Sequence, residues 1–212
     1  SLILKSRDLL FYHLLTNDYL LPFQQYMDQE DYLSVLKTMK TKDGSVFSIP
    51  ITLAVDQELS KSSTIILKNE TNRILGKLHV EGSYLPDLEL EIESLTGCND
   101  SNHPYYSEIM SRAGKVYVHG KIEKVRDHDF NSHLDIRKSI HELRNTFVNS
   151  GFQNIIGFQT RNPIHKSHYN LTLQAMRIVG DDSLVLINPV SDTIQEVDID
   201  LDTRVSCYKH VL

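Results

Sequence analysis

Residues able to bind and activate an anion gather between positions 159 and 168. Arg161 carries a planar guanidinium whose fork of N–H donors matches a tetrahedral oxyanion. His165 and His168 are three residues apart, so they would share one face of a helical turn, and each imidazole can donate a hydrogen bond. The polar residues beside the arginine are Gln159, Thr160 and Asn162. Residues of these types in this order indicate a site that binds a polyphosphate, with attack at phosphorus as the matching reaction.

Residues 154–176 predict the elements that would position these side chains: a strand, a short polar loop at 159–162, and a helix. Ile155, Ile156 and Phe158 form an apolar run typical of a buried strand. Pro163 fixes φ and lacks an N–H donor, which suits the start of a helix. Ligands of open α/β sheets bind at the carboxyl ends of strands, and a helix start adds N–H groups that attract phosphate.

The two histidines could also be surface residues or zinc ligands. An H-x-x-H spacing alone is most often a pair of surface histidines. A zinc site would need further ligands, and the chain contains no H-E-x-x-H. Four polar residues at a strand end, however, cost stability unless they face solvent or a ligand. We therefore expect a ligand site that holds no metal ion by protein groups alone.

The run from 159 to 163, with His165 and His168, resembles the signature Q-T-R-N-P-x-H-x-x-H of the ATP sulfurylase (sulfate adenylyltransferase) family, with all seven specified positions present. Weaker similarities to that family occur at residues 28–35, 48–55, 103–104 and 120–123. Arg204, Tyr208 and Leu212 resemble its R-x-x-x-Y-x-x-x-L stretch. Residues 19–27 depart from it, because the family's F-S-P-L-x-G-F is replaced by Y-L-L-P-F-Q-Q-Y-M.

The resemblance implies that MgATP and sulfate are converted to adenosine 5′-phosphosulfate and pyrophosphate, by direct in-line attack of a sulfate oxygen on the α-phosphorus. Mg²⁺ would arrive with ATP, not on a protein site. The implied catalytic residues are Thr160, Arg161 and Asn162. Gln159 and Arg161 would bind sulfate. The implied nucleotide-binding residues are Phe158, Gln159, Asn162, His165 and His168. The implied protein is a cytoplasmic homo-oligomer.

The fold class expected is α+β and α/β: a β-rich PUA-like barrel domain at 1–137, then a doubly wound Rossmann-like nucleotidyltransferase domain at 138–212, with 126–139 as the linker. In the first domain we predict two helices before residue 40, the second with a capped start at Asp28 and an end near Met39. Strands are predicted at 47–55, 63–68 and 74–82, a short element at 95–98, and one bent strand or a strand pair at 115–125. The apolar/acidic alternation up to Glu93 is assigned to strands.

In the second domain we predict a helix at 140–149, capped by Ser139 and Glu142 and burying Leu143, Phe147 and Val148. A strand follows at 183–189, then a long polar loop at 190–203, then a helix from Arg204. The loop's acids are expected to be solvated; they are Asp192, Glu196, Asp198, Asp200 and Asp202.

Composition narrows the possible functions. The net charge of −6 and pI of about 5.9 predict no nucleic-acid surface. Cys98 and Cys207 are far apart and are expected to be buried reduced thiols, which favours the cytosol. No apolar run approaches the roughly 18 residues of a membrane helix, so no membrane partner is expected. Because the chain starts at Ser1 without a methionine, lacks the family's later G-R-D-H-A-G-like stretch and stops in a helical pattern, we expect a truncated catalytic domain.

Three alternatives remain open from sequence. The first is another H-x-x-H nucleotidyltransferase with a different acceptor. The second is an RNA-binding PUA-like protein whose α/β part is an inactive remnant. The third is a purely structural domain that binds no nucleotide.

Overall fold

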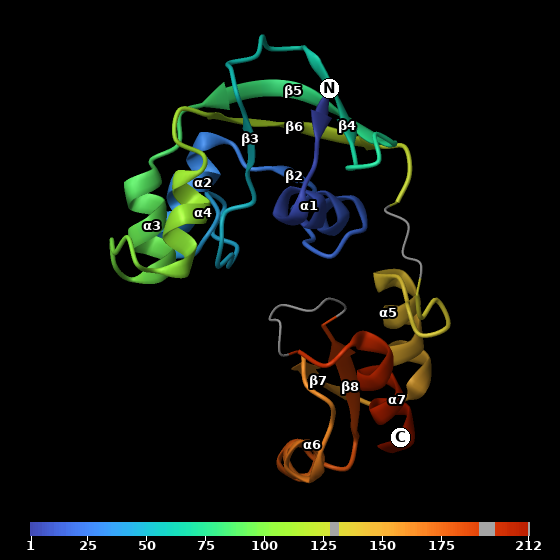
Figure 1. The fold of residues 1–212 in the computed structure, drawn as a ribbon. Coiled ribbons are helices and arrows are strands. Elements are labelled where there is room, and N and C mark those ends of the chain that lie inside the picture. Colours follow the sequence, from blue (N-terminus) through green and yellow to red (C-terminus); the bar gives the residue numbers. More distant parts are fainter. Residues whose placement is uncertain (128–131, 191–197, 212) are drawn as a thin grey trace. The chain divides into compact units, whose positions relative to one another are not determined.

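The structure, a computed structural model, describes residues 1–127, 132–190 and 198–211. The chain divides into two compact units, Ser1–Arg137 and Lys138–Leu212 (Figure 1). Among the helices of the described ranges, none has the length and apolarity needed to cross a bilayer. Of the acids noted in the 190–203 loop, Asp192 and Glu196 lie outside these ranges.

A six-stranded sheet forms the centre of the first unit. Its strands are β1 (Leu2–Ile3), β2 (Gln25–Tyr26), β3 (Leu53–Val55), β4 (Thr64–Lys68), β5 (Ile74–Tyr84) and β6 (Val116–Lys124). They run in the order β1-β4-β5-β6-β2, with β3 also paired to β6, and only β1 and β4 are parallel. The predicted β-rich architecture is confirmed, but among the described residues these strands do not close into a barrel. Both end strands have only two residues, which leaves few backbone groups to close the sheet.

One strand prediction is corrected. Residues 47–55 form a strand only from Leu53, because Pro50 has no N–H to donate to a ladder. Of the two possibilities predicted for residues 115–125, the structure has a single strand, β6, in which φ of Gly120 is +151°. A Cβ on Gly120 would lie 2.0 Å from the carbonyl oxygen of His79, so only glycine fits there. The strands predicted at 63–68 and 74–82 are confirmed as β4 and β5.

The helices of the first unit are α1 (Ser6–Thr16), α2 (Gln29–Thr38), α3 (Leu88–Thr96) and α4 (Pro104–Met110). The prediction of α2 is confirmed: the Asp28 side chain accepts a hydrogen bond from Asp31 N at 2.9 Å and caps it. The interpretation of residues 88–93 as strand is wrong. Their apolar/acidic alternation fits a strand, but Asp87 caps a helix there and Gly97 ends it in the left-handed conformation.

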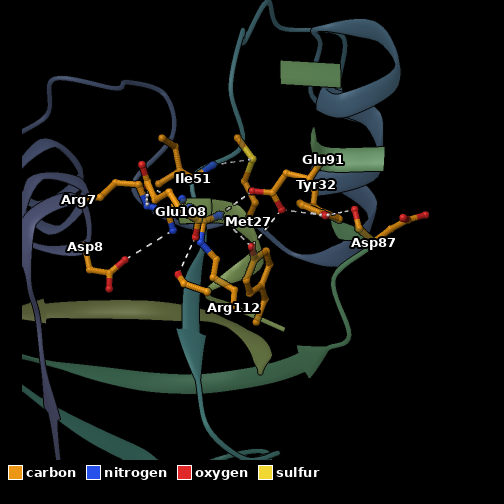
Figure 2. Close-up of polar contacts among 11 residues, drawn as sticks. Arg7, Asp8, Met27, Tyr32, Ile51, Asp87, Glu91, Glu108 and Arg112 are labelled. Atoms are coloured by element: carbon orange, nitrogen blue, oxygen red, sulfur yellow. Dashed lines mark hydrogen bonds and ion pairs between the residues drawn. The ribbon is translucent and has the colours of Figure 1, made fainter. Parts of the chain in front are cut away.

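A buried ion pair connects α3 and α4 to this sheet. Arg112 Nη1 lies 2.7 Å from Glu91 Oε1, and the two side chains are 7% and 1% exposed (Figure 2). The hydroxyls of Tyr32 and Tyr117 each donate to Glu91 Oε2 at 3.0 Å. Burial and the adjacent Glu91 carboxylate raise the pKa of Tyr117 to about 12, so its hydroxyl keeps its proton and remains a donor.

The second unit alternates helix and strand: α5 (Ile140–Ser150), β7 (Asn154–Thr160), α6 (Lys166–Val179), β8 (Ser183–Pro189) and α7 (Leu201–Val211). This order confirms the prediction. The capping box of Ser139 and Glu142 is confirmed, and Gly151 ends α5 with φ +77°. Val148 is 80% exposed, so its predicted burial is wrong. Cys98 is exposed and Cys207 half-buried, so the prediction of buried thiols is wrong as well.

We predict that Arg112→Met lowers the free energy of unfolding by about 3–5 kcal/mol, because it leaves the Glu91 carboxylate buried without its cation. Lys77→Met is the matched control. It breaks an exposed ion pair with Glu123, at 3.0 Å, and should cost less than about 1 kcal/mol. Urea denaturation of both variants measures the difference. Equal losses in the two variants would contradict the structural importance of the buried pair.

Candidate functional site

The site lies at the carboxyl end of β7. This strand pairs in parallel with β8 from Asn154 opposite Ser183 to Thr160 opposite Pro189, so both strands end at one edge of the sheet. Val190 N extends the pairing by donating to Thr160 O at 3.0 Å. Gln159 and Thr160 are the last residues of the strand, so the predicted loop is shorter by two residues. The sequence suggests that Pro163 starts the helix, but α6 begins three residues later, at Lys166.

The side chains at this strand end have different surroundings. Gln159 and Asn162 are exposed, while Thr160 is buried at 8% exposure. Thr160 Oγ1 accepts from Asn162 N at 3.1 Å and thereby shapes the turn. The Arg161 side chain is 38% exposed, and its Nε lies 4.0 Å from Oδ1 of Asp198. The guanidinium therefore lies at the surface beside a carboxylate that is only 5% exposed, and is not buried in the core.

The two histidines lie together, as their spacing predicted. The ring centroids of His165 and His168 are 3.9 Å apart, and that of Phe158 is 5.8 Å from His168. His165 occupies the N-cap position of α6, but its side chain makes no capping bond. His168 Nδ1 is buried and has no hydrogen-bond partner among the described residues. A buried imidazole nitrogen in this state is costly unless a ligand satisfies it.

Helix α7 fixes the backbone of the strand-end turn, a contact that sequence reasoning missed. Arg204 is fully buried, and its Nη1 donates to the carbonyl oxygens of Arg161 at 3.1 Å and Val190 at 2.8 Å. The hydroxyl of Tyr208 donates to Asn162 O at 2.6 Å. Burial raises the pKa of Tyr208, which keeps the hydroxyl protonated. The available signal was the four-residue spacing of Arg204 and Tyr208, which places both on one helix face.

Helix α7 begins three residues earlier than predicted, because Asp200 caps it. Asp200 Oδ1 accepts from Thr203 N at 2.8 Å, and Oδ2 accepts from the Thr203 hydroxyl at 2.8 Å. These bonds to its charged form hold the pKa of Asp200 below its ordinary value. In the parts of the chain that the structure describes, no three His, Cys, Asp or Glu side chains converge as a metal site.

Comparisons with known proteins agree with this two-part architecture. Residues 1–127 match the family model of the PUA-like domain, and residues 134–212 match the ATP-sulfurylase model. The hexameric APS kinase from Thiobacillus denitrificans has a similar fold over 98% of this chain and 37% of its own, with a TM-score of 0.71 at 16% identity. The chain is thus a PUA-like domain followed by an α/β unit.

The chain belongs to the PUA-like family, and its second part is similar to the ATP-sulfurylase family model. Along its whole length it is 34% identical to the sulfate adenylyltransferase of Schizosaccharomyces pombe, 35% to that of Candida albicans and 36% to that of Neurospora crassa. It spans 44%, 43% and 38% of these relatives, which is less than half of each.

We predict that Asp200→Asn flattens the dependence of stability on pH between about pH 5 and pH 3. A carboxyl whose pKa is lowered by folding stabilises the fold above its unfolded pKa, and this contribution is lost as pH falls through the folded pKa. Urea denaturation across this pH range measures the slope. Asp202→Asn, in the first turn of α7, removes the same charge two residues further along the chain and serves as the control. An unchanged slope in Asp200→Asn would contradict the capping role.

Proposed function

We propose that the protein containing this chain is a sulfate adenylyltransferase, which transfers the AMP group of MgATP to sulfate and releases pyrophosphate. The observation that carries the proposal is the position of residues 159–162 at the carboxyl end of β7, beside the cluster of Phe158, His165 and His168. His168 Nδ1 in that cluster has no hydrogen-bond partner within the described ranges, which favours a ligand there. The sulfate adenylyltransferases that match the whole chain support the same reaction.

In the proposed reaction a sulfate oxygen forms a bond to the α-phosphorus. The bond from that phosphorus to the bridging oxygen breaks, and its electron pair leaves with pyrophosphate. No side chain needs to become a nucleophile, so catalysis depends on positioning two anions and on neutralising the charge that develops. Mg²⁺ enters bound to the ATP phosphates.

The residue roles follow from the side-chain chemistry. Arg161 and Gln159 bind sulfate, since one offers a cationic fork and the other an exposed amide. Asn162 and Thr160 contact the phosphates or the leaving group. The Phe158 ring packs near the nucleotide. His165 and His168 donate hydrogen bonds to the triphosphate.

We further propose that residues 1–137 and 138–212 are separate domains of a cytoplasmic homo-oligomer. These boundaries are supported by the two compact units of the chain and by the two family matches. The name of the hexameric APS kinase of similar fold is consistent with an oligomer.

Each alternative function predicts a different assay result. A nucleotidyltransferase with another acceptor would release pyrophosphate without sulfate or its analogue molybdate. An RNA-binding protein would shift RNA in a gel and release no pyrophosphate. A structural domain would bind no nucleotide. Neither the family matches nor the relatives favour these readings. Pyrophosphate release from ATP, measured with and without sulfate on the full-length protein, tests the proposal, and release that ignores sulfate contradicts it.

We predict that Arg161→Ala abolishes sulfate-dependent pyrophosphate release, because the oxyanion loses its cationic partner. The melting temperature should change little, since the side chain is 38% exposed. Arg177→Ala, which removes an exposed arginine from the last turn of α6, is the matched control and should retain activity. Normal turnover in a folded Arg161→Ala protein would contradict the assignment of the sulfate site.

We predict that His165→Ala lowers kcat roughly 10²-fold, as for other lost donors that stabilise charge in the transition state. The exposed His210, in the last turn of α7, provides the control variant His210→Ala, whose kcat should stay at the wild-type value. Steady-state kinetics with saturating ATP and sulfate measures both variants. A His165→Ala enzyme as fast as the wild type would identify His165 as an ordinary surface histidine.

A further inference from the structure

We propose that Arg204 and Tyr208 are positioning residues that hold the strand-end turn in its anion-binding shape, an inference that rests on the proposed function. Neither side chain is assigned to contact substrate. They act through the backbone of Arg161, Asn162 and Val190, to which they donate hydrogen bonds.

The Arg204 guanidinium forms hydrogen bonds with the residues that follow two neighbouring strands. Arg161 is the first residue after β7 and Val190 the first after β8, and Arg204 Nη1 donates to the carbonyl oxygens of both. Tyr208, one helical turn further along α7, donates to the next carbonyl, that of Asn162. Consecutive peptide groups of the turn are thus held by consecutive turns of one helix.

These bonds also favour an anion at the turn. Carbonyl oxygens carry partial negative charge, so a turn that directed them at sulfate or phosphate would repel the ligand. Here the oxygens of Arg161 and Asn162 are bound by α7. Arg204 brings a buried cationic guanidinium, and a charge that is shielded from solvent is screened little by salt.

A packing role alone would not require an arginine here. Burying an ionised side chain is costly, and an apolar residue of similar volume fills a core position at a lower cost. Arg204 is nevertheless completely buried, whereas Arg161, the first residue of the turn, remains at the surface. The Nη1 atom of Arg204 carries two N–H donors and bonds main-chain carbonyls at both strand exits, which supplies a reason for the arginine.

Tyr208→Phe tests the proposal, because it removes one hydroxyl and leaves the ring in place. Tyr12→Phe is the matched control: Tyr12 is also buried and donates to a carbonyl, Leu75 O, at the same 2.6 Å, but it lies in the first unit. We expect similar drops in melting temperature for the two variants. In Tyr208→Phe alone, kcat should fall about tenfold or more, with little change in the KM for ATP.

Hydrogen exchange separates this proposal from the proposed function. Peptides covering residues 158–164 should exchange faster in Tyr208→Phe than in the wild type or in Tyr12→Phe. Wild-type exchange and kcat in Tyr208→Phe would overturn the positioning role, as would equal losses of kcat in both variants. If the wild-type protein releases no pyrophosphate with sulfate, the proposed function fails, and exchange at residues 158–164 still decides whether α7 holds the turn.

Arg204→Lys adds a test of the cation. It keeps a positive charge but replaces the planar guanidinium, whose Nη1 donates to both carbonyls, with a shorter ammonium side chain, so kcat should lie between those of the wild type and Arg204→Met. Equal activity of the Lys and Met variants, both folded by circular dichroism, would overturn the electrostatic part of the proposal. Should Arg204→Met fail to fold, Tyr208→Phe decides the positioning role without it.

Discussion

The parallel pairing of β7 with β8 is the constraint on which the rest of the site depends. It brings Thr160 opposite Pro189, so the chain leaves both strands at one edge and the next residues, Arg161 and Val190, become neighbours. Only this convergence lets the single side chain of Arg204 bind both. The surface guanidinium of Arg161 and the imidazoles of His165 and His168 therefore lie next to a turn whose carbonyl groups are hydrogen-bonded by α7.

The two units use buried charge in different ways. In the first unit, Arg112 meets the carboxylate of Glu91, and two tyrosine hydroxyls complete the hydrogen bonding, so the charges largely neutralise one another. In the second unit, Arg204 donates to carbonyl oxygens that carry only partial charge. The first arrangement holds helices to a sheet, whereas the second holds the backbone at the exits of two strands.

Local signals in the sequence predicted local structure well. Ser139 and Glu142 marked the start of α5, Asp28 marked that of α2, and the apolar runs located β7 and β8. Prediction failed where distant contacts decide the outcome. The alternation at residues 88–93 fits a strand, yet Glu91 turns inward from a helix to meet Arg112. The burial of Arg204 was not predicted, because its Nη1 donates to carbonyl groups 14 and 43 residues away. Pairing of the histidines followed from their spacing, while the burial of His168 Nδ1 did not.

The most direct test is to locate the oxyanion itself. Crystals of the full-length protein grown with selenate, a sulfate analogue, and an ATP analogue with a methylene bridge between its α- and β-phosphorus atoms would reveal selenium by anomalous scattering. Selenium within hydrogen-bonding distance of the Arg161 guanidinium, with the triphosphate against His165 and His168, is the result expected from the strand-end geometry. Selenium bound away from residues 159–162 while the nucleotide analogue is present would contradict it.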